Sequence, residues 1–462
     1  MKRLMIAVWA CAVVAVSGCY PERIVWSPDG QRALVAGKER LYLCDPNGKL
    51  TDLGTQAPAC MAWLADSRRY VAATQDKLTA WKDIEPLLSA EDKDRLIRLA
   101  EDMRKEILAS DNVDLGKLKC VQGKDSGELS AAKVYLRDRH AEGLAEKLGA
   151  TWKEFESASR DCTVIGVCEI SHGAASQPAQ ILAKSLNGVV SIRVPSHGKA
   201  VAWSAARPEQ QGIGAADLFV VPTDGKAEPR VVAAACSWYF DWSTDGRRLV
   251  YGAVVGTADA GDEPRLGAIQ QREVCSADGT LLKEPGAPQI LAGGLFGEMT
   301  RVRCLQDGRI FFSSLEVQLP ITPEDMPKKG SIFALDPSRE STITRLVTHS
   351  AQEDVPDGLD FFSVSPDGTK VCIPGGDGEA AVVELATGKV ETIVGKPKEG
   401  SPEQKLRTVP VWRATGELCL MVPPAHLLGS PSRAEIILWT APGKARLLSK
   451  DWPDEVIKAL SE

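Results

Sequence analysis

Residues 24–37, IVWSPDGQRALVAG, carry the pattern that decides the fold: an apolar run, a tight polar turn and a second apolar run. Two further copies are FDWSTDGRRLVYGA at 240–253 and FSVSPDGTKVCIPG at 362–375. Proline at the second turn position presets φ, aspartate hydrogen-bonds locally, and glycine accepts a positive φ. The flanking runs are rich in Val, Ile, Leu, Trp and Phe, so each copy predicts a β-hairpin.

Weaker copies raise the number of turns to seven and give the pattern a period. They lie at 61–74, 192–205, 302–314 and 411–422, and the seven turns end at Gly30, Ser67, Gly198, Gly246, Gly308, Gly368 and Gly416. Without one segment of about 77 residues, discussed below, the mean spacing is about 51 residues, near that of propeller blades. We therefore expect an all-β β-propeller, with seven blades as the first choice and six or eight left open.

Four tryptophans precede the turns at equivalent positions, namely Trp26, Trp63, Trp242 and Trp412. We expect them to be core residues that wedge the blades together, because large apolar side chains recurring in register are typical of packed repeats. A ligand-binding cage is the less favoured interpretation.

The sequence W-S-P-D-G, followed by a basic residue and an apolar strand, resembles the TolB-type propeller repeat, a relative of WD-type repeats. The match is good at residues 26–35, 242–251 and 364–373 and loose elsewhere. The resemblance implies a rigid extracytoplasmic binding platform, and the TolB protein itself binds an outer-membrane lipoprotein. The motif specifies a fold unit and no activity.

The N-terminus has the three parts of an export signal. Lys2 and Arg3 precede about 13 uncharged, mostly apolar residues, and small residues lead to Cys19. Such a run is too short to span a bilayer and fits a secretory signal peptide over 1–18. V-S-G-C also resembles the bacterial lipobox, which implies that Cys19 becomes a lipidated N-terminus. Tyr20, in place of the aspartate that retains lipoproteins at the inner membrane, favours the periplasmic face of the outer membrane. An ordinary signal peptide is the alternative.

These signals give a bacterial cell-envelope protein, anchored to the membrane through lipid on Cys19 and organised in five parts. They are the signal peptide (1–18), the first part of the propeller (19–83), a helical insertion (84–160), the remaining propeller (161–450) and a C-terminal tail (451–462). In the insertion, Ser89 can cap a helix whose apolar residues recur every three or four positions from Leu96 to Ile107. A second helix is expected from Ser130 to Leu148, with Gly149 as its cap. The helices either pack on the propeller or dock a partner.

Ten of the twelve cysteines remain once Cys11 leaves with the signal and Cys19 takes lipid. Export permits disulfides, and Cys162 and Cys168 are close enough in sequence to form a small disulfide loop. Cys372 and Cys419 lie in strand-like runs, where a small buried apolar residue is at least as good an interpretation.

Residues for catalysis or metal binding do not form a recognisable motif. The chain lacks G-x-S-x-G and H-E-x-x-H. Some TolB-like propellers are oligogalacturonide lyases whose metal is held by channel histidines. Here His172, His197, His349 and His426 lie in four different stretches, but His197 belongs to a turn and is expected at a blade corner. We expect no catalytic residue, metal or other cofactor.

Charge and motifs together point to binding. The net charge of −7 gives no reason to expect nucleic acid as a partner. The sequence therefore predicts a membrane-anchored scaffold that binds a protein or another ligand, a protein partner being favoured. The alternative is a lyase- or hydrolase-like propeller enzyme that acts on a carbohydrate or other small substrate at the central channel.

Overall fold

The computed structural model describes most of the chain from residue 22 onward. It covers residues 22–461 apart from 111–112, 172–173, 176–177, 179, 208–213, 256–264, 297–299, 318–329, 340–341, 349–355, 357–358, 376–378, 396–408 and 423–432. These residues form two compact units. The helical unit comprises Gln75–Val164 and Lys184–Gly188, and the ring unit comprises the described residues of Cys19–Thr74, Ile165–Ala183 and Val189–Glu462.

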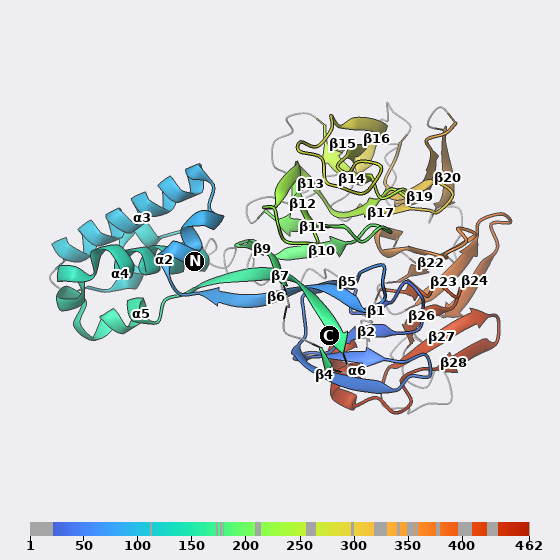
Figure 1. Ribbon diagram of the computed structural model, residues 1–462, viewed down its shortest axis with the longest axis horizontal. Coiled ribbons are helices and arrows are strands. Elements are labelled where there is room, and N and C mark those ends of the chain that lie inside the picture. Colours follow the sequence, from blue (N-terminus) through green and yellow to red (C-terminus); the bar gives the residue numbers. More distant parts are fainter. Residues whose placement is uncertain are drawn as a thin grey trace. The chain divides into compact units, whose positions relative to one another are not determined.

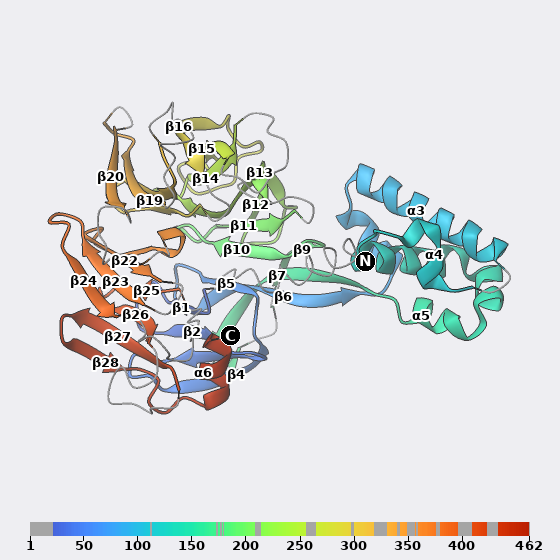
Figure 2. The ribbon, with the colours of Figure 1, turned by 180° about the vertical axis from the view of Figure 1, so that it is seen from behind.

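The described part of the ring unit consists mainly of antiparallel strands in six sheets (Figures 1 and 2). The first sheet contains β1 (Ile24–Trp26), β2 (Ala33–Ala36), β3 (Arg40–Cys44) and β4 (Leu50–Gln56). The second contains β5 (Cys60–Trp63), β6 (Arg69–Leu78), β7 (Arg160–Ser171), β8 (Ala174–Ala175) and β9 (Gln180–Ser185). The third contains β10 (Val189–Arg193), β11 (Ala200–Ala206), β12 (Ala216–Pro222), β13 (Arg230–Trp242), β14 (Arg248–Val254), β15 (Arg265–Glu273) and β16 (Gln289–Phe296).

The last three sheets have four strands each. They contain β17 (Val302–Cys304), β18 (Ile310–Ser314), β19 (Ser331–Asp336) and β20 (Thr342–Thr348); β21 (Ser363–Val364), β22 (Lys370–Pro374), β23 (Ala380–Glu384) and β24 (Val390–Val394); and β25 (Val411–Trp412), β26 (Leu418–Val422), β27 (Glu435–Ala441) and β28 (Lys444–Leu447). Each of these three sheets is a meander in which sequential strands are neighbours, as in propeller blades.

The seven predicted turns each join the first two strands of a repeat unit, which we call a blade. Five sheets hold one such turn, and the seven-stranded sheet holds two, at Gly198 and Gly246. Its long strand β13 has room for the last strand of blade 3 and the first strand of blade 4. The β-propeller architecture predicted from the repeat is therefore confirmed, with seven turn-bearing blades in six sheets.

The turns have the chemistry that the sequence pattern predicts. In the first, the Ser27 hydroxyl donates to Asp29 at 2.5 Å, and the Asp29 carboxylate accepts from the Gln31 amide at 2.9 Å. Gly30 has φ +69°, a value that glycine adopts without strain. The same serine–aspartate pair recurs at Ser243–Asp245 and Ser365–Asp367.

Three of the four tryptophans that precede the turns form hydrogen bonds between neighbouring blades. The indole N–H of Trp63 donates to the carbonyl oxygen of Val25 at 2.8 Å, and the indole N–H of Trp242 donates to the backbone carbonyl oxygen of Arg193 at 3.2 Å. Trp412 donates in the same way to Ser363 at 3.4 Å. Each bond reaches the first strand of the preceding blade, so these residues act as the expected wedges.

The ring is closed by contacts between the last blade and the first. One apolar cluster contains Trp26 and Val35 from the first sheet, Ile436 and Leu438 from the last, and Leu460 from helix α6 (Asp454–Ser461). The predicted C-terminal tail thus forms a helix that covers this junction.

The helical unit contains α2 (Trp81–Ile84), α3 (Ala90–Ala109), α4 (Ser126–Leu148) and α5 (Lys153–Glu156), which confirms a helical insertion after the second hairpin. Ser89 caps α3 as predicted, accepting from the Asp92 amide at 3.0 Å. The helix buries the expected face, Leu96, Leu99, Ala100, Met103 and Ile107. Helix α4 starts four residues earlier than predicted, because the Asp125 carboxylate accepts from the amides of Gly127 and Glu128 and caps it there.

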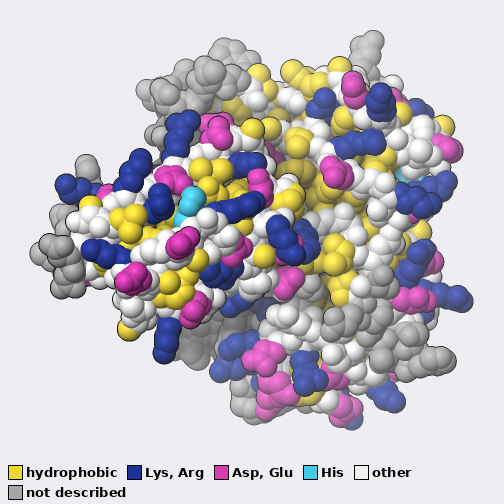
Figure 3. Space-filling model, turned by 60° about the vertical axis from the view of Figure 1, so that its left-hand side comes forward, with side chains coloured by type: hydrophobic (Ala, Val, Ile, Leu, Met, Phe, Trp, Pro, Cys, Tyr) yellow, Lys and Arg dark blue, Asp and Glu magenta, His cyan; other side chains and the backbone are white. Residues whose placement is uncertain are grey.

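None of the described helices combines the length and the apolar character needed to cross a lipid bilayer. On the face drawn in Figure 3, Lys and Arg side chains are interspersed with Asp and Glu. The visible surface therefore lacks the single-sign field that typifies nucleic-acid binding.

Candidate functional site

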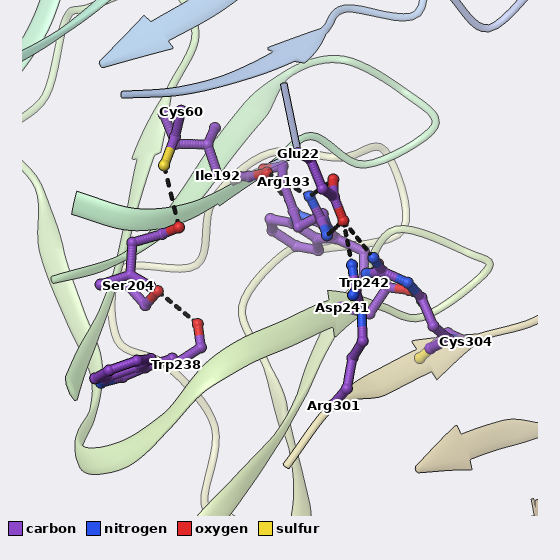
Figure 4. Close-up of polar contacts among 12 residues, drawn as sticks. Glu22, Cys60, Ile192, Arg193, Ser204, Trp238, Asp241, Trp242, Arg301 and Cys304 are labelled. Carbon is purple, nitrogen blue, oxygen red and sulfur yellow. Dashed lines mark hydrogen bonds and ion pairs between the residues drawn. The ribbon is translucent and has the colours of Figure 1, made fainter. Parts of the chain in front are cut away.

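Three arginines of the ring unit hold a single carboxylate, that of Glu22, two residues before β1. Arg193, the last residue of β10, donates from Nη2 to Oε1 at 2.8 Å and from Nη1 to Oε2 at 3.0 Å. Arg303 in β17 donates to the same Oε1 at 2.6 Å, and Arg301, just before β17, donates to it as well. Figure 4 shows the Glu22 carboxylate beside Arg193 and Arg301. We call these four residues the arginine clamp.

The clamp joins blades that are not neighbours along the chain. Glu22 precedes blade 1, Arg193 belongs to blade 3, and Arg301 and Arg303 belong to blade 5. First strands of successive blades contact one another, as β1 does β5, β5 does β10, and β13 does both β10 and β17. In a ring of blades, residues of alternate blades meet only where the first strands surround the common axis. The clamp therefore lies at the ring axis.

Two members of the clamp, Arg193 and Arg303, share one position in the repeat, which Asp241 occupies in the blade between them. Arg193, Asp241 and Arg303 each lie five residues before the glycine that ends their turn. In blade 1 this position is Val25, which is half-buried between the buried Ile24 and Trp26. Along the first strand, Ile24 and Trp26 pack in the cluster between the last blade and the first, whereas Val25 lies on the opposite face and packs against the cluster between blades 1 and 2.

The clamp is deeply embedded, and its charges strongly perturb one another. The side chain of Arg301 is 1% exposed and that of Glu22 is 21% exposed. Burial alone would raise the pKa of Glu22, but the charges of Arg193, Arg303 and Arg301 outweigh it and hold this pKa far below its usual range. Burial and the neighbouring Arg303 lower the pKa of Arg301 to about 10. Glu22 is therefore ionised at neutral pH, and the positive charge of Arg301 is incompletely compensated.

Arg301 keeps unused hydrogen-bonding capacity. Its Nε and Nη1 are buried without a hydrogen-bond partner among the described residues. The guanidinium lies over the ring of Tyr239, 5.1 Å from the ring centroid, an interaction that stabilises a cation but accepts no conventional hydrogen bond.

Two aspartates lie near the arginines and hydrogen-bond to other groups, while the charge of Asp241 also acts on Arg193. Asp241 accepts from the amides of Trp242 at 2.9 Å and Cys304 at 3.0 Å. Burial raises the pKa of Asp360, against a hydrogen bond with Ser313 and the charge of Arg301. Three guanidinium groups thus lie near the charges of Glu22 and Asp241, and two donor atoms of Arg301 have no partner within the described residues and suit a further anion.

Chemically, this arrangement is suited to binding. Even at a pKa of about 10, Arg301 remains protonated at neutral pH, so the clamp offers fixed donors and no proton-transfer group. Rigid guanidinium forks recognise carboxylates in a bidentate manner, as Arg193 does here. Within the described ranges, His, Cys, Asp and Glu form no group of three that could hold a metal ion.

The histidines singled out from the sequence lie apart from the clamp or outside the described residues. His197 lies in its turn and contacts the carbonyl oxygen of Gly246 at 3.0 Å, while its Nδ1 accepts from the Lys199 amide. His140 belongs to the helical unit, 3.1 Å from Glu101. His172, His349 and His426 are outside the described residues, as are the lipobox and Cys19.

The predicted bridge between Cys162 and Cys168 is not formed. Both residues lie in the continuous strand β7, and both are free thiols. Six residues of extended strand separate two Cα atoms by about 20 Å, whereas a disulfide requires less than about 7 Å. Cys372 and Cys419 are buried among apolar side chains, as expected.

The clamp itself was missed from the sequence. Its signal is present in the repeat, because one register position changes from Val25 and Ala62 in the first two blades to Arg193, Asp241 and Arg303 in the next three. Glu22 lies outside the repeat and carries no such signal.

No protein-family model and no curated protein sequence matches the chain. Solved structures similar to it include a protein described as TolB from Agrobacterium tumefaciens, at 16% identity and a TM-score of 0.37 over 58% of this chain and 83% of that one. A puromycin hydrolase variant shows 17% identity and a TM-score of 0.42 over 64% of this chain and 44% of its own.

An oligogalacturonate lyase from Vibrio parahaemolyticus shows 11% identity and a TM-score of 0.42 over 76% of this chain and 73% of that one. These likenesses assign no function to this chain, whose β-propeller architecture is established by its own strands and turns.

Proposed function

We propose that this protein is a lipid-anchored β-propeller of the bacterial cell envelope that binds a protein partner at the arginine clamp and catalyses no reaction. The observation that carries the proposal is the convergence of Arg193, Arg301 and Arg303 from alternate blades on one carboxylate at the ring axis. Always-charged donors held on rigid strands are suited to recognition, because they lose little conformational freedom when a ligand binds.

The proposed anchor agrees with this position. Cys19 precedes Glu22 by three residues, and three residues of chain span at most about 11 Å. A lipid on Cys19 would therefore attach the ring at a short distance from the clamp. We expect the partner to approach the clamp in the space next to the membrane.

Affinity capture with the full-length lipidated protein tests the proposal. Detergent-solubilised envelope membranes are passed over the wild type, over the double variant R193Q/R303Q and over the control R247Q/R309Q. The control pair removes the same charge from arginines whose partners, Glu273 and Asp307, are on exposed surfaces. We expect one partner with the wild type and the control, and at least a tenfold loss with R193Q/R303Q. Equal capture by all three folded proteins would refute the proposal.

Mass spectrometry of the mature N-terminus tests the anchor separately. Cleavage before Cys19 with acyl groups on that residue is the expected result. An unmodified Cys19, or cleavage at another bond, would remove the membrane part of the proposal.

A further inference from the structure

We propose that the arginine clamp is a carboxylate-binding site that Glu22 occupies in the unliganded protein, and that an acidic group of the partner takes the place of Glu22. The inference rests on the proposed function and adds to it the chemistry of the ligand and the competition that regulates its access.

The geometry defines the class of ligand. Arg193 presents two parallel N–H groups, at 2.8 and 3.0 Å from the two oxygens of one carboxylate. Arg301 and Arg303 both donate to the Oε1 that Arg193 already contacts. A planar carboxylate satisfies this set of donors when one oxygen accepts from all three arginines and the other oxygen accepts from Arg193 alone.

The site has the charge and the donors for a stronger ligand than Glu22. Nε and Nη1 of Arg301 are unpartnered within the described part of the chain, and this side chain is 1% exposed. The lowered pKa of Arg301 has the same origin, namely burial next to Arg303. A ligand that places a carboxylate here and also satisfies these donors gains interactions that Glu22 leaves unmade.

Glu22 is able to yield its position because the ring does not depend on its backbone. It precedes β1, whose register with β2 begins at Ile24↔Val35, and its side chain is 21% exposed. Rotation of this side chain releases the clamp without breaking a strand pair. The affinity for an external carboxylate is then the intrinsic affinity multiplied by the fraction of molecules in which Glu22 has left the clamp.

The variant E22A and acetate provide the direct test. Alanine removes Cγ and the carboxylate of Glu22, and acetate supplies the same atoms. Binding is measured by calorimetry and by the acetate dependence of the melting temperature, with chloride at equal ionic strength. We expect saturable binding to E22A, at least tenfold tighter than to the wild type, and a further loss of at least tenfold in E22A/R303Q. If E22A does not fold, E22Q replaces it: a neutral amide competes for the arginines less strongly than a carboxylate, so acetate should again bind more tightly than to the wild type.

A matched carboxylate controls for a general effect of unpaired arginines. Glu417 contacts Arg413 and Arg446 within the last blade, and E417A exposes two arginines away from the clamp. We expect acetate to bind E22A at least tenfold more tightly than E417A. Equal acetate binding by E22A and E417A, or no acetate binding to folded E22A and E22Q, would overturn the inference. Glu22 would then serve only to stabilise the fold. Inorganic phosphate is titrated in parallel, and a preference for it over acetate would overturn the assignment to carboxylates.

The two proposals fail in different ways. If no partner depends on the clamp for capture, the proposed function is refuted. Acetate binding that depends on Arg303 would still support the carboxylate site in that case. If E22A and E22Q fold but do not bind acetate, the carboxylate site is refuted. The proposed function stands in that case, provided that partner capture still depends on the clamp.

Discussion

Arg413 joins the last blade to the first, because its guanidinium donates to the carbonyl oxygen of Gly30 from Nη2 at 2.6 Å and from Nε at 3.2 Å. The two residues are 383 positions apart in the sequence. The same guanidinium lies over Trp26, 4.4 Å from the ring centroid. Among the described residues no strand pairs across the two sheets. The ring is closed by these contacts, by the apolar cluster under α6 and by further hydrogen bonds, such as that from the indole N–H of Trp452 to the carbonyl oxygen of Gly48 at 2.7 Å.

The first prediction concerns this closure. R413Q should lower the free energy of unfolding by about 3 kcal/mol, because it leaves the Glu417 carboxylate without its buried cation and the Gly30 carbonyl without its donors. Denaturant unfolding measures the loss. The control R446Q removes a half-exposed arginine of the same blade, and it should cost less than about 1 kcal/mol. Equal losses in the two variants would show that ring closure does not depend on Arg413.

The second prediction uses two glycines with similar backbone conformations. Gly48 and Gly416 have φ of +94° and +85°. A Cβ on Gly48 would lie 2.1 Å from the carbonyl oxygen of Leu448, whereas a Cβ on Gly416 would meet nothing within 4 Å. G416A should therefore cost about 1 kcal/mol of backbone strain, and G48A should cost at least twice as much, since the last sheet must also move. Thermal or denaturant melts of both variants decide this, and equal costs would exclude close packing at the junction.

The third prediction concerns the bonds between blades. W63F retains an aromatic ring but removes the indole N–H that donates to Val25 at 2.8 Å. It should cost about 1 to 2 kcal/mol, and W63A, which also opens a cavity, about 3 to 5 kcal/mol. Equilibrium unfolding of the two variants separates the hydrogen bond from the packing. A stability of W63F equal to that of the wild type would contradict the role of the indole N–H.

Much of this architecture was accessible from the sequence because turn chemistry is local. Asp29 and Gly30 encode their turn within a few residues, and the apolar spacing of Leu96 to Ile107 encodes the buried face of α3. The start of α4 was misplaced because capping by Asp125 depends on one side chain and not on a period. The bridge between Cys162 and Cys168 was wrong because closeness in sequence is no measure of distance along an extended strand.

The arginine clamp was inaccessible for a different reason. A charge in a strand is ordinarily solvated, and only the closure of the ring brings Arg193 to Arg303. Glu22 lies outside the repeat altogether, so that no spacing links it to either arginine. Long-range electrostatic sites of this kind require the topology before their members can be recognised.

The fourth prediction is a pH dependence of stability. The folded state holds the pKa of Glu22 far below its unfolded value of about 4.3. The stability that its ionised form contributes is therefore fully present above about pH 5 and is lost as the pH falls through that value toward the folded pKa. The difference in unfolding free energy between the wild type and E22Q, about 3 kcal/mol at pH 7, should shrink steadily below about pH 4.5.

Denaturant melts of both proteins between pH 3 and pH 7 measure this difference. The other charged groups near the clamp are Arg193, Arg301, Arg303, Asp241 and Asp360, which are common to both proteins. The raised pKa of Asp360 acts in the opposite direction, but its effect largely cancels in the difference. A constant difference across this range would show that Glu22 is not an ionised ligand of the arginines.

The central claim, that recognition takes place at the ring axis, is tested most directly by photocrosslinking in cells. A photoreactive amino acid replaces Val25, which occupies in blade 1 the repeat position that Arg193 and Arg303 occupy in theirs, or Val231, which is 53% exposed in β13. We predict a crosslinked partner at position 25 that disappears in R193Q/R303Q, and none at position 231. Crosslinks formed only from position 231, or from position 25 without any dependence on the arginines, would contradict the account.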